Sequence, residues 1–564
     1  MPTSLPNHDI DAACRQSAAA FAVLSRLPPE SRAQILDSIA AALDSHRDHI
    51  LHTCAAETAL TLEELAPEFA RTTATLQMFA ALIRNGSWCR ASLDLKREPC
   101  AQAQAHPSLP TTPPHHPHPS APNPSAPLPP SPLPSARAPG SPTHLIGPTH
   151  DLRALLIPLG PVAVFGSSNF PLAYGVCGGD TASALAAGCS VIIKEHPAHP
   201  ITGRLLATIA QAAINLATNE PRASASGNTS SDALQHVLQY IPNEDPKDFS
   251  IAQQLVQNSR VTAVGFTGST RAGFALQTLC NSRPGPIPIF AEMGSLNCVF
   301  ICPDAFARRA DAIADELAAS AMARIGQQCT KPGVVFVLGE SELRTLNHMI
   351  RDRLLAAIPR RMLSRTVADN YYRRLDETAA EGSLESTPLP TPAQRRAALG
   401  VPVIFSSNDL WNETRRGVWE EIFGPAMIIA RYNTTDSPFL LGALTLSIYA
   451  ESEDIDAPFE GRGKWRSDSL REFLNTIRAR AGRIIFNTPP TGVRVATSMV
   501  HGGPFPATNR PDTTAVGPRA IERWCRPICY QNCPDILLPP ELQNANPRHL
   551  HRTINGEPTA APIP

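Results

Sequence analysis

The strongest constraint on the fold of this chain is a regular alternation of short apolar stretches with helix-like ones. Strands are predicted at Leu155–Phe165, Ser190–Lys194 and Val261–Phe266. Helices are predicted between and after them, at Asp180–Ala187, Thr202–Leu216 and Thr270–Cys280. Strands that alternate with helices form a parallel sheet covered by helices. We therefore expect an α/β fold, with a second α/β domain where the alternation resumes after Phe290.

The segment from Ala101 to His150 departs sharply from this pattern. The chain has 57 prolines in 564 residues, and this segment is rich in Pro, Ser, His and Ala. Proline removes backbone donors, and the segment lacks the apolar residues that offset the entropy of ordering. We interpret it as a disordered insertion, whose histidines either bind a transition metal or bind metals only adventitiously. A smaller polar stretch, Asn219–Asp232, is predicted to be a lengthened loop.

Charge and cysteine content limit the classes of partner and compartment. The net charge is −1, so the chain lacks the basic surface expected of a protein that binds nucleic acid or an anionic membrane. No apolar run reaches the length of about 20 residues that spans a membrane. The 13 cysteines are an odd number without framework spacing, and the N-terminus lacks a secretory pattern. These features favour a cytoplasmic protein with reduced thiols.

Three motifs, in chain order, carry reactive groups. Thr267-Gly268-Ser269 joins a predicted strand to a helix, where backbone N–H groups can receive a phosphate. Glu292 follows an apolar stretch, and Cys329 lies among turn-forming residues in Gly326-Gln327-Gln328-Cys329-Thr330-Lys331-Pro332-Gly333. Taken singly, these are as well explained by a plain turn, a surface glutamate and a structural cysteine. Together, a thiol nucleophile, a carboxylate base and a cofactor turn indicate oxidation through a covalent thioester.

These motifs resemble the ordered motif set of the aldehyde dehydrogenase superfamily. The resemblance covers residues 8 to 540, interrupted by the proline-rich insertion, and includes Gly265-Phe266-Thr267-Gly268-Ser269, Glu292-Met293-Gly294-Ser295, Gly326-Gln327-Gln328-Cys329 and Glu420-Glu421-Ile422-Phe423-Gly424-Pro425. Within the superfamily the chain is most similar to the 2-oxoglutarate semialdehyde (2,5-dioxopentanoate) dehydrogenases, in the segments Phe165–Pro171, Gly178–Cys189, Lys194–Pro200, Pro490–Val493 and Met499–Thr508. An NADP-linked long-chain aldehyde dehydrogenase shares several of these segments.

The resemblance implies a role for each matched residue. Cys329 is expected to attack the aldehyde, and the amide of Asn169 and the backbone N–H of Cys329 to stabilise the oxyanion. Glu292 is expected to activate the water that hydrolyses the thioester. The expected cofactor-binding residues are Phe165, Lys194, Gly268, Ser269, Gly294, Glu421 and Phe423, with Lys194 and Glu421 on ribose hydroxyls and Phe423 near the nicotinamide. No metal is expected.

Two positions bear on the cofactor and on the nucleophile. NAD-preferring relatives often carry a glutamate three residues beyond the position of Lys194, where this chain has Pro197. The cofactor is therefore expected to be NADP, with NAD as the alternative. Lys331 stands where relatives commonly have asparagine. It would either lower the pKa of Cys329 and attract a carboxylated substrate, or be an exposed lysine, and the exposed lysine is the favoured interpretation.

A cluster of cysteines lies near the C-terminus. Cys525, Cys529 and Cys533 are four residues apart, but Pro527 and Pro534 interrupt a helix there, and relatives place an oligomer-forming strand nearby. We interpret the three thiols as structural or incidental rather than as a metal site.

The predicted organisation follows the family. Residues 1–100 and 151–289 would form the cofactor-binding domain around the insertion at 101–150, and residues 290–485 the catalytic domain. Residues 486–540 would return to the cofactor domain and add a small β oligomerisation element, and residues 541–564 would be a tail. A homodimer or homotetramer is expected.

The reaction that the resemblance implies is oxidation of a small aldehyde, in first place 2,5-dioxopentanoate to 2-oxoglutarate. Two alternatives stay open. One is an NADP-dependent dehydrogenase of medium- or long-chain aldehydes, and the other is a catalytically silent relative that acts as an interaction protein through the proline-rich insertion.

Overall fold

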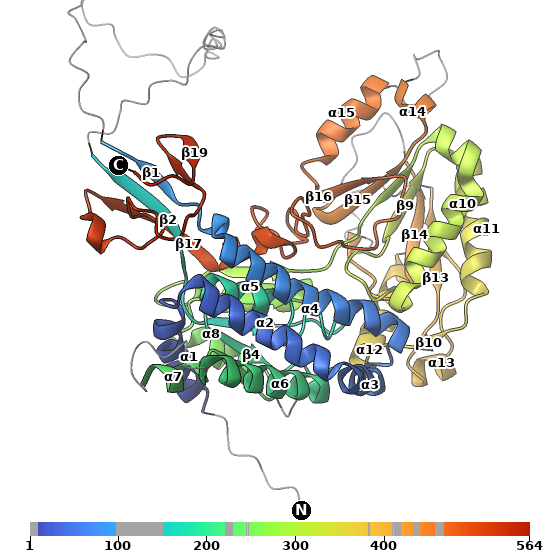
Figure 1. Cartoon of the computed structure of the whole chain (residues 1–564). Helices are drawn as coiled ribbons and strands as arrows, with labels where there is room; N and C mark the ends of the chain where they lie inside the picture. Colours follow the sequence, from blue (N-terminus) through green and yellow to red (C-terminus); the bar gives the residue numbers. More distant parts are fainter. Residues whose placement is uncertain are drawn as a thin grey trace, which may run out of the picture. The chain divides into compact units, whose positions relative to one another are not determined.

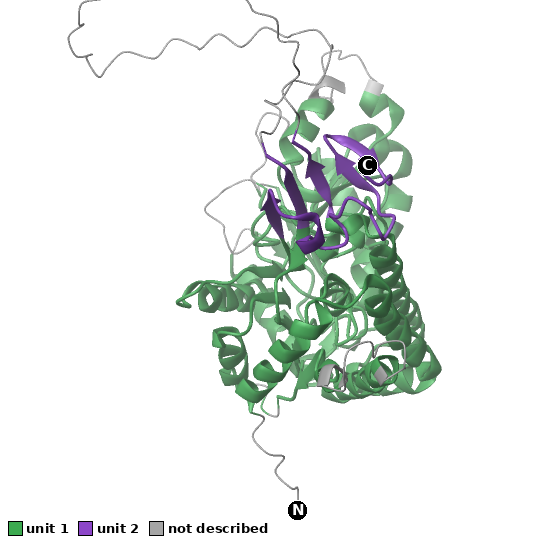
Figure 2. Cartoon of the chain, turned by 60° about the vertical axis from the view of Figure 1, so that its left-hand side comes forward, with its two compact units in different colours: residues 1–89, 156–526 green, residues 90–155, 527–564 purple. Residues whose placement is uncertain are grey.

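The computed structural model describes residues 9–96, 150–219, 229–243, 245, 248–381, 384–408, 410, 419–432, 440–456 and 467–563. The proline-rich insertion predicted at 101–150 lies outside the described residues, apart from His150. The predicted loop at 219–232 lies partly outside them, and its last residues belong to helix α7 (Thr229–Leu234). The chain divides into two compact units, Met1–Cys89 with Leu156–Arg526, and Arg90–Leu155 with Pro527–Pro564 (Figure 2).

The first sheet of the larger unit has five strands, all parallel, in the order β5-β4-β3-β6-β7. Their bounds are β3 Val162–Phe165, β4 Val191–Lys194, β5 Leu238–Ile241, β6 Ala263–Thr267 and β7 Ile289–Glu292. Phe165 is in register with Lys194 on one side and Phe266 on the other, and Thr267 is in register with Glu292. The carboxyl ends of these strands therefore meet at one edge of the sheet.

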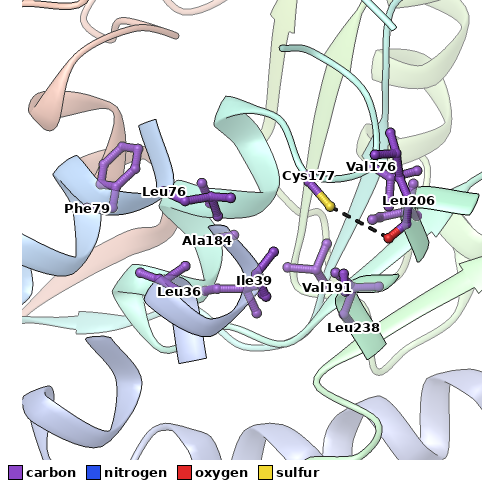
Figure 3. Packing of buried hydrophobic residues seen from close by; sticks show 14 of the residues in the cluster. Leu36, Ile39, Leu76, Phe79, Val176, Cys177, Ala184, Val191, Leu206 and Leu238 are labelled. Atoms are coloured by element: carbon purple, nitrogen blue, oxygen red, sulfur yellow. Dashed lines mark hydrogen bonds between the residues drawn. The ribbon is translucent and has the colours of Figure 1, made fainter. Parts of the chain in front are cut away.

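Helices cover both faces of this sheet, because alternate residues of its strands are buried on opposite sides. Val162 and Val164 join the hydrophobic cluster of one face, and Ala163 and Phe165 that of the other. The first face packs against α2 (Pro29–Ser45), α3 (Arg47–Thr58), α4 (Leu62–Asn85), α5 (Gly179–Ala187) and α6 (Pro200–Asn219). The second packs against α1 (Ile10–Leu24), α8 (Ser250–Gln257) and α9 (Thr270–Asn281). Figure 3 shows the first cluster, with Leu36, Leu76 and Val191 among its members.

The N-terminal part of the larger unit forms helices α1 to α4, and α4 has clear sequence signals at both ends. Thr61 and Glu64 form a capping box at its start, in which each side chain accepts from the backbone N–H of the other residue. Gly86 ends the helix in the left-handed conformation, with φ 74°, which glycine adopts without steric cost. The helix presents Leu65, Phe69 and Leu76 to the core.

The prediction of one strand is wrong. Leu155–Phe165 was expected to be a single strand, but β2 (Leu152–Pro158) and β3 are separate and belong to different sheets. Gly160 has a φ of 141°, and a Cβ there would lie 2.6 Å from Cγ2 of Thr262. Pro161 follows and offers no backbone donor. Gly160 and Pro161 together turn the chain from one sheet to the next, although apolar residues continue through this segment of the sequence.

A second sheet of seven strands follows in the larger unit, in the order β11-β13-β14-β9-β8-β15-β16. Its strands are β8 (Val299–Ile301), β9 (Val334–Val337), β11 (Glu385–Ser386), β13 (Val403–Ser407), β14 (Ala426–Arg431), β15 (Ala443–Tyr449) and β16 (Ala481–Phe486). β11 is antiparallel to its neighbour and the other pairs are parallel. A two-stranded sheet pairs β10 (Arg360–Arg361) with β12 (Leu399–Gly400).

The second sheet is also covered on two faces (Figure 1). α10 (Pro303–Met322) and α11 (Glu340–Leu355) pack on one face, and α12 (Arg365–Ala380) and α15 (Ser467–Ile477) on the other. The short helices α13 (Pro392–Arg396) and α14 (Ser452–Asp456) complete this part. The predicted α/β fold with a second α/β domain is confirmed. Within the described residues we find no helix that is both long and apolar enough to cross a membrane.

A third sheet lies mostly in the smaller unit and has the strand order β17-β2-β1-β18-β19. It consists of β1 (Ser92–Asp94), β2, β17 (Cys525–Gln531), β18 (Arg552–Ile554) and β19 (Glu557–Thr559). β1 is antiparallel to β2 and parallel to β18, and β18 is antiparallel to β19. Residues 541–564, for which a tail was expected, therefore include two strands. Cys525 and Cys529 lie on a strand, and the twelve cysteines of the described residues are free thiols.

A buried ion pair joins segments of the larger unit that are far apart in sequence. Nη2 of Arg523, on the 3-10 helix Pro518–Trp524, lies 2.6 Å from Oδ1 of Asp180 on α5. Their side chains are only 4% and 10% exposed. The neighbouring Trp524 donates its indole N–H to Oγ of Ser183 at 2.7 Å. The C-terminal return of the chain is thus fixed to the helix that follows the Gly166–Gly178 loop.

We expect the change Arg523→Leu to lower the free energy of unfolding by about 3–5 kcal/mol, because it leaves the Asp180 carboxylate buried without its partner. Arg519→Leu is the matched control, since the Arg519 side chain is half exposed and lies 3.9 Å from Glu522. The control should cost less than about 1 kcal/mol. Urea unfolding followed by tryptophan fluorescence measures both. Equal losses of unfolding free energy in the two variants would show that the buried Asp180–Arg523 pair contributes no more stability than the exposed pair.

Candidate active site

The candidate site lies where the carboxyl ends of the first sheet meet the turn before β9. In open α/β sheets, ligands bind outside the carboxyl ends of the strands. Phe165, Lys194, Thr267 and Glu292 end four neighbouring strands. Phe165 and Lys194, predicted for the cofactor, and Glu292, predicted as the base, thus come from a single edge of the first sheet.

Cys329 sits in a tight turn between a short 3-10 helix (Ala323–Gly326) and β9. Gly326 has a φ of 64°, and a Cβ there would lie 2.3 Å from the carbonyl oxygen of Gly424. A Cβ on Gly333 would lie 2.1 Å from the carbonyl oxygen of Leu296. Both glycines are therefore needed for the backbone to pass this closely. Cys329 is partly exposed, whereas the other cysteines of the larger unit, apart from Cys525, are buried.

Glu292, Cys329 and His501 form a compact cluster. Nε2 of His501 lies 2.8 Å from Oε1 of Glu292 and 3.6 Å from Sγ of Cys329. The three reactive atoms lie within 4.8 Å of one another. Glu292 is 5% exposed and His501 1%. Among the described residues, neither carboxylate oxygen of Glu292 has a hydrogen-bond donor of good geometry, so both keep capacity to accept from a water.

The backbone around β7 places His501 opposite the carboxylate. Met293 donates its N–H to the carbonyl of Ala507, and Glu292 forms an antiparallel bridge with Thr508. The N–H of His501 donates to Oγ1 of Thr514 at 2.9 Å, and its carbonyl accepts from Ala515 at 2.7 Å. The backbone of His501, which carries the imidazole, is therefore held by hydrogen bonds at both its N–H and its carbonyl.

The cluster shifts the pKa of two of its members in opposite directions. Burial is the largest influence on the pKa of Glu292 and acts to raise it, but His501, Arg523 and the Cys329 thiol together outweigh burial, so the net pKa is lowered. Burial, together with the negative charges of Glu292 and Glu421, raises the pKa of the Cys329 thiol well above its usual value. A base must therefore take the thiol proton before attack.

Asn169 lies beside the nucleophile turn. Its Nδ2 donates to the carbonyl of Gln327 at 3.0 Å, two residues before Cys329. A side-chain amide has two N–H donors, so one remains for a ligand. The amide of Asn169 therefore lies against the turn that carries Cys329, and its role in stabilising the oxyanion stays a prediction.

A buried charge network holds the Asn169 loop in place. Oε1 of Glu68, on α4, accepts from the N–H of Leu172 and of Ala173 at 2.8 and 3.0 Å. Its Oε2 lies 2.7 Å from Nη2 of Arg324. Arg324 in turn donates to the carbonyl of Asn169 at 2.8 Å. Helix α4, the Asn169 loop and the Cys329 turn are thus connected through one carboxylate.

The interpretation of Lys331 as an exposed lysine is wrong. The residue is 2% exposed, and its Nζ donates to the carbonyls of Ala426 and Pro332 at 2.6 and 3.2 Å. Burial lowers the pKa of Lys331 to about 8, and Glu421 opposes that shift. The cation that acts to lower the pKa of Cys329 is Arg71. Lys331 therefore interacts with Glu421 rather than with the thiol.

Glu421 lies against the segment that follows Glu292. A Cβ on Gly294 would lie 2.6 Å from Oε2 of Glu421, so glycine makes room for this carboxylate. Burial raises the pKa of Glu421 to about 8, opposed by Lys331 and by the backbone of Ser295. Glu421 and Gly294, both predicted to bind the cofactor, therefore lie next to each other. Phe423 is partly buried two residues farther on.

The residues at the sheet edge fit a nicotinamide dinucleotide. Gly268 and Ser269 are exposed at the start of the 12-residue helix α9, where N–H groups and the helix dipole favour a phosphate. Oγ of Ser269 caps the helix by accepting from Ala272 at 3.3 Å. Lys194 is partly buried at the end of β4, and burial lowers its pKa. Pro197 is exposed and brings no carboxylate to this edge.

The sequence patterns did not indicate His501 or Arg71 as site residues. The one local signal for His501 is its position immediately before Gly502-Gly503, both closely packed on neighbouring carbonyls. Arg71 carries no local signal. The three atoms of Glu292, Cys329 and His501 could also hold a metal ion, so the expectation of no metal stays a prediction.

Comparisons with known proteins agree with this geometry. The model of the aldehyde dehydrogenase family matches residues 3–105 and 138–439. The chain is 33% identical to alpha-ketoglutaric semialdehyde dehydrogenase 2 of Azospirillum brasilense, over 97% of this chain and 91% of that protein. It is 32% identical to alpha-ketoglutaric semialdehyde dehydrogenase of Acinetobacter baylyi, with the same coverage.

Solved structures of lower identity share the fold. Aldehyde dehydrogenase C from Pseudomonas syringae, a mutant in complex with NAD⁺ and octanal, has a TM-score of 0.65 at 17% identity, covering 93% of this chain and 88% of that one. Methylmalonate-semialdehyde dehydrogenase from Oceanimonas doudoroffii has a TM-score of 0.64 at 16% identity, covering 93% and 90%. From its motifs, its fold and its relatives, the chain belongs to the aldehyde dehydrogenase family, whose members are NAD(P)-linked oxidoreductases that act on aldehyde groups.

Proposed function

We propose that the protein oxidises 2,5-dioxopentanoate to 2-oxoglutarate with NADP, using Cys329 as nucleophile and Glu292 as the base for hydrolysis. The observation that carries the proposal is the cluster in which the Cys329 thiol, a buried carboxylate and an imidazole lie within 4.8 Å of one another. Such a cluster supplies both a nucleophile and groups that can accept its proton. Two relatives over 30% identical are named for the same aldehyde.

Attack on the aldehyde begins with loss of the thiol proton. His501 at 3.6 Å and Glu292 nearby are the acceptors that the site offers. Sγ of Cys329 then bonds to the aldehyde carbon, and the carbonyl oxygen takes the negative charge. The free N–H of Asn169 and the backbone N–H of Cys329 would stabilise that oxyanion, and loss of one such donor costs about 10²–10³-fold in rate.

Oxidation and hydrolysis complete the reaction. The bound nicotinamide supplies the hydride acceptor, and the carbon attached to Cys329 becomes a thioester. Glu292 then takes a proton from water, whose oxygen bonds to the thioester carbon, and the carbon–sulfur bond breaks to release the acid. Both Glu292 oxygens have open acceptor positions, and the lowered pKa of the carboxyl keeps it ionised. Both features support this role.

The cofactor proposal rests on the edge near Lys194. Lys194 and Glu421 would bind ribose hydroxyls, Ser269 and Gly268 a phosphate, and Phe165, Gly294 and Phe423 the remaining surface. An adenosine 2′-phosphate meets no carboxylate at Pro197, which favours NADP over NAD. The enzyme is proposed to be cytoplasmic and a homodimer or homotetramer.

The function is tested by kcat/KM for 2,5-dioxopentanoate, succinate semialdehyde, glycolaldehyde and hexanal, each with NAD and with NADP. We expect the highest value for 2,5-dioxopentanoate with NADP. A highest value for hexanal would favour the medium- or long-chain alternative, and higher values with NAD would contradict the cofactor proposal. If no aldehyde is oxidised and iodoacetamide does not modify Cys329 selectively, the protein is a silent relative.

Replacing His501 is expected to move the pH dependence of turnover. Among the groups that lower the pKa of Glu292 against burial, His501 contributes most, so its loss in His501→Leu is expected to raise that pKa. Glu292 would then be ionised only at higher pH. The acid limb of the kcat–pH profile should shift upward, with kcat at pH 7 about 10–100-fold lower and partly restored at alkaline pH.

The control for this change is His348→Leu, which removes an exposed imidazole on α11 that pairs with Asp352. Its kcat–pH profile should match that of the unaltered enzyme between pH 5.5 and 9. An unchanged profile for His501→Leu would mean that the imidazole does not set the protonation of Glu292.

A further inference from the structure

Glu292, Cys329 and His501 bring a carboxylate, a thiol and an imidazole to one point, and these are the three kinds of side chain that bind zinc. One potential ligand atom of each residue lies within 4.8 Å of the other two. In the described parts of the chain, no other group of three or more His, Cys, Asp or Glu side chains meets this distance. Beyond its part in the reaction, the cluster therefore has the composition of a metal site.

The separation of the sulfur from the imidazole nitrogen equals that of two ligands of tetrahedral zinc. Zinc binds sulfur at about 2.3 Å and nitrogen at about 2.0–2.1 Å. At a tetrahedral angle the two ligand atoms are then about 3.6 Å apart. Sγ of Cys329 and Nε2 of His501 lie 3.6 Å apart. These two atoms are thus already placed for an ion to bridge them.

The carboxylate needs a small movement to become the third ligand. A nitrogen and an oxygen ligand of tetrahedral zinc are about 3.4 Å apart. Nε2 of His501 and Oε1 of Glu292 lie 2.8 Å apart, so the carboxylate has to move back by roughly half an ångström. Among the described residues, neither Glu292 oxygen accepts a hydrogen bond of good geometry. The movement therefore breaks no such bond.

The surroundings favour a bound cation. Glu292 and His501 are buried, whereas Cys329 is partly exposed. A divalent cation between the carboxylate and the thiolate compensates both negative charges, which otherwise repel each other. The backbone of His501 is held by hydrogen bonds with Thr514 and Ala515. The ligands therefore need little ordering when an ion binds.

We propose that Glu292, Cys329 and His501 form a zinc site, at which Zn²⁺ binds reversibly and inhibits the enzyme. On binding, the Cys329 thiol loses its proton to solvent. Its sulfur, one Glu292 oxygen and Nε2 of His501 each form a bond to the ion, and no group is oxidised or reduced. A water fills the fourth position, as in zinc sites with three protein ligands.

The bound ion would block both halves of the reaction. The sulfur lone pair that attacks the aldehyde and the carboxylate that activates water are both bonded to zinc. The inhibition therefore rests on the proposed function, whereas the binding of zinc does not. His501 is the deciding ligand, because without it the cluster supplies only two.

The first test measures binding without any aldehyde. The full-length protein is freed of metal with EDTA, exchanged into EDTA-free buffer and titrated with Zn²⁺ in competition with a chromophoric zinc indicator. In Cys329→Ser and in His501→Leu, the affinity of the site should fall at least about 100-fold, the upper end of the loss seen for groups that only orient a ligand. The controls Cys529→Ser and His348→Leu remove an exposed thiol and an exposed imidazole and should bind zinc like the unaltered protein.

The competing explanation is zinc bound elsewhere on the chain, for example by the histidines of the proline-rich insertion. Such binding is the same in all of these variants. Equal affinity in Cys329→Ser, in His501→Leu and in the unaltered protein would therefore overturn the proposal.

A second readout reports the ligands directly. Co²⁺ in place of zinc gives intense visible bands when its site is tetrahedral, and a charge-transfer band in the near ultraviolet when a thiolate is bound. The unaltered protein should show both features, and Cys329→Ser should lose the charge-transfer band. Weak visible bands typical of octahedral Co²⁺, without charge transfer, would contradict the site.

Inhibition is measured separately, with the aldehyde that the enzyme oxidises best. Zn²⁺ should lower the rate of the unaltered enzyme, and EDTA should restore it. At a Zn²⁺ concentration that halves this rate, His501→Leu should keep nearly all of its own, lower activity. Equal inhibition of both enzymes, or inhibition that EDTA does not reverse, would contradict the proposal.

The outcomes for the zinc site and for the proposed function are separable. If zinc binds as described but the protein oxidises no aldehyde, the site stands and the proposed function is wrong. If the protein oxidises 2,5-dioxopentanoate but His501→Leu and Cys329→Ser bind zinc as tightly as the unaltered protein, the function stands and the zinc site is wrong.

Discussion

The carboxylate of Glu68 is the contact on which the geometry of the site depends. It is 4% exposed, accepts two backbone N–H groups of the Asn169 loop, and pairs with Arg324 before the nucleophile turn. Arg324 also lies 4.2 Å from the centre of the Phe170 ring and donates to the carbonyl of Asn169. Because one buried anion holds all three segments, the oxyanion donor and the nucleophile cannot move independently without leaving charges unpaired.

Electrostatics within the cluster favour a resting site in which the base is charged and the thiol is not. The pKa of Glu292 is lowered despite its burial, and the pKa of Cys329 is raised by burial and by the carboxylate beside it. Ionising both groups at once would place two negative charges within 4.8 Å. The thiolate therefore forms only when another group of the cluster accepts the thiol proton, and Arg71 is the cation that acts to offset its charge.

The sequence was informative where function lies on consecutive residues and weak where it depends on distant contacts. The turns at Gly268 and Glu292 follow stretches that could be recognised in the sequence as strands, and the parallel register brings these two turns together at one edge of the first sheet. His501 is 172 residues from Cys329, and Glu68 is 104 residues from Leu172. No local pattern marks Glu68, and the one local signal for His501 is the Gly502-Gly503 pair that follows it. Lys331 was misread because lysine is usually exposed, and only the tertiary structure brings Glu421 and the carbonyl of Ala426 to it.

Hydrolysis of a Cys329 thioester by Glu292 is tested most directly by mixing Glu292→Gln with NADP and excess 2,5-dioxopentanoate and measuring intact mass. The expected result is a burst of about one NADPH per subunit, a stable acyl adduct on the Cys329 peptide, and little further turnover. The double change Cys329→Ser with Glu292→Gln should give neither burst nor adduct. Sustained turnover by Glu292→Gln at the rate of the unaltered enzyme, with no adduct on Cys329, would contradict the role of Glu292 as the base for hydrolysis.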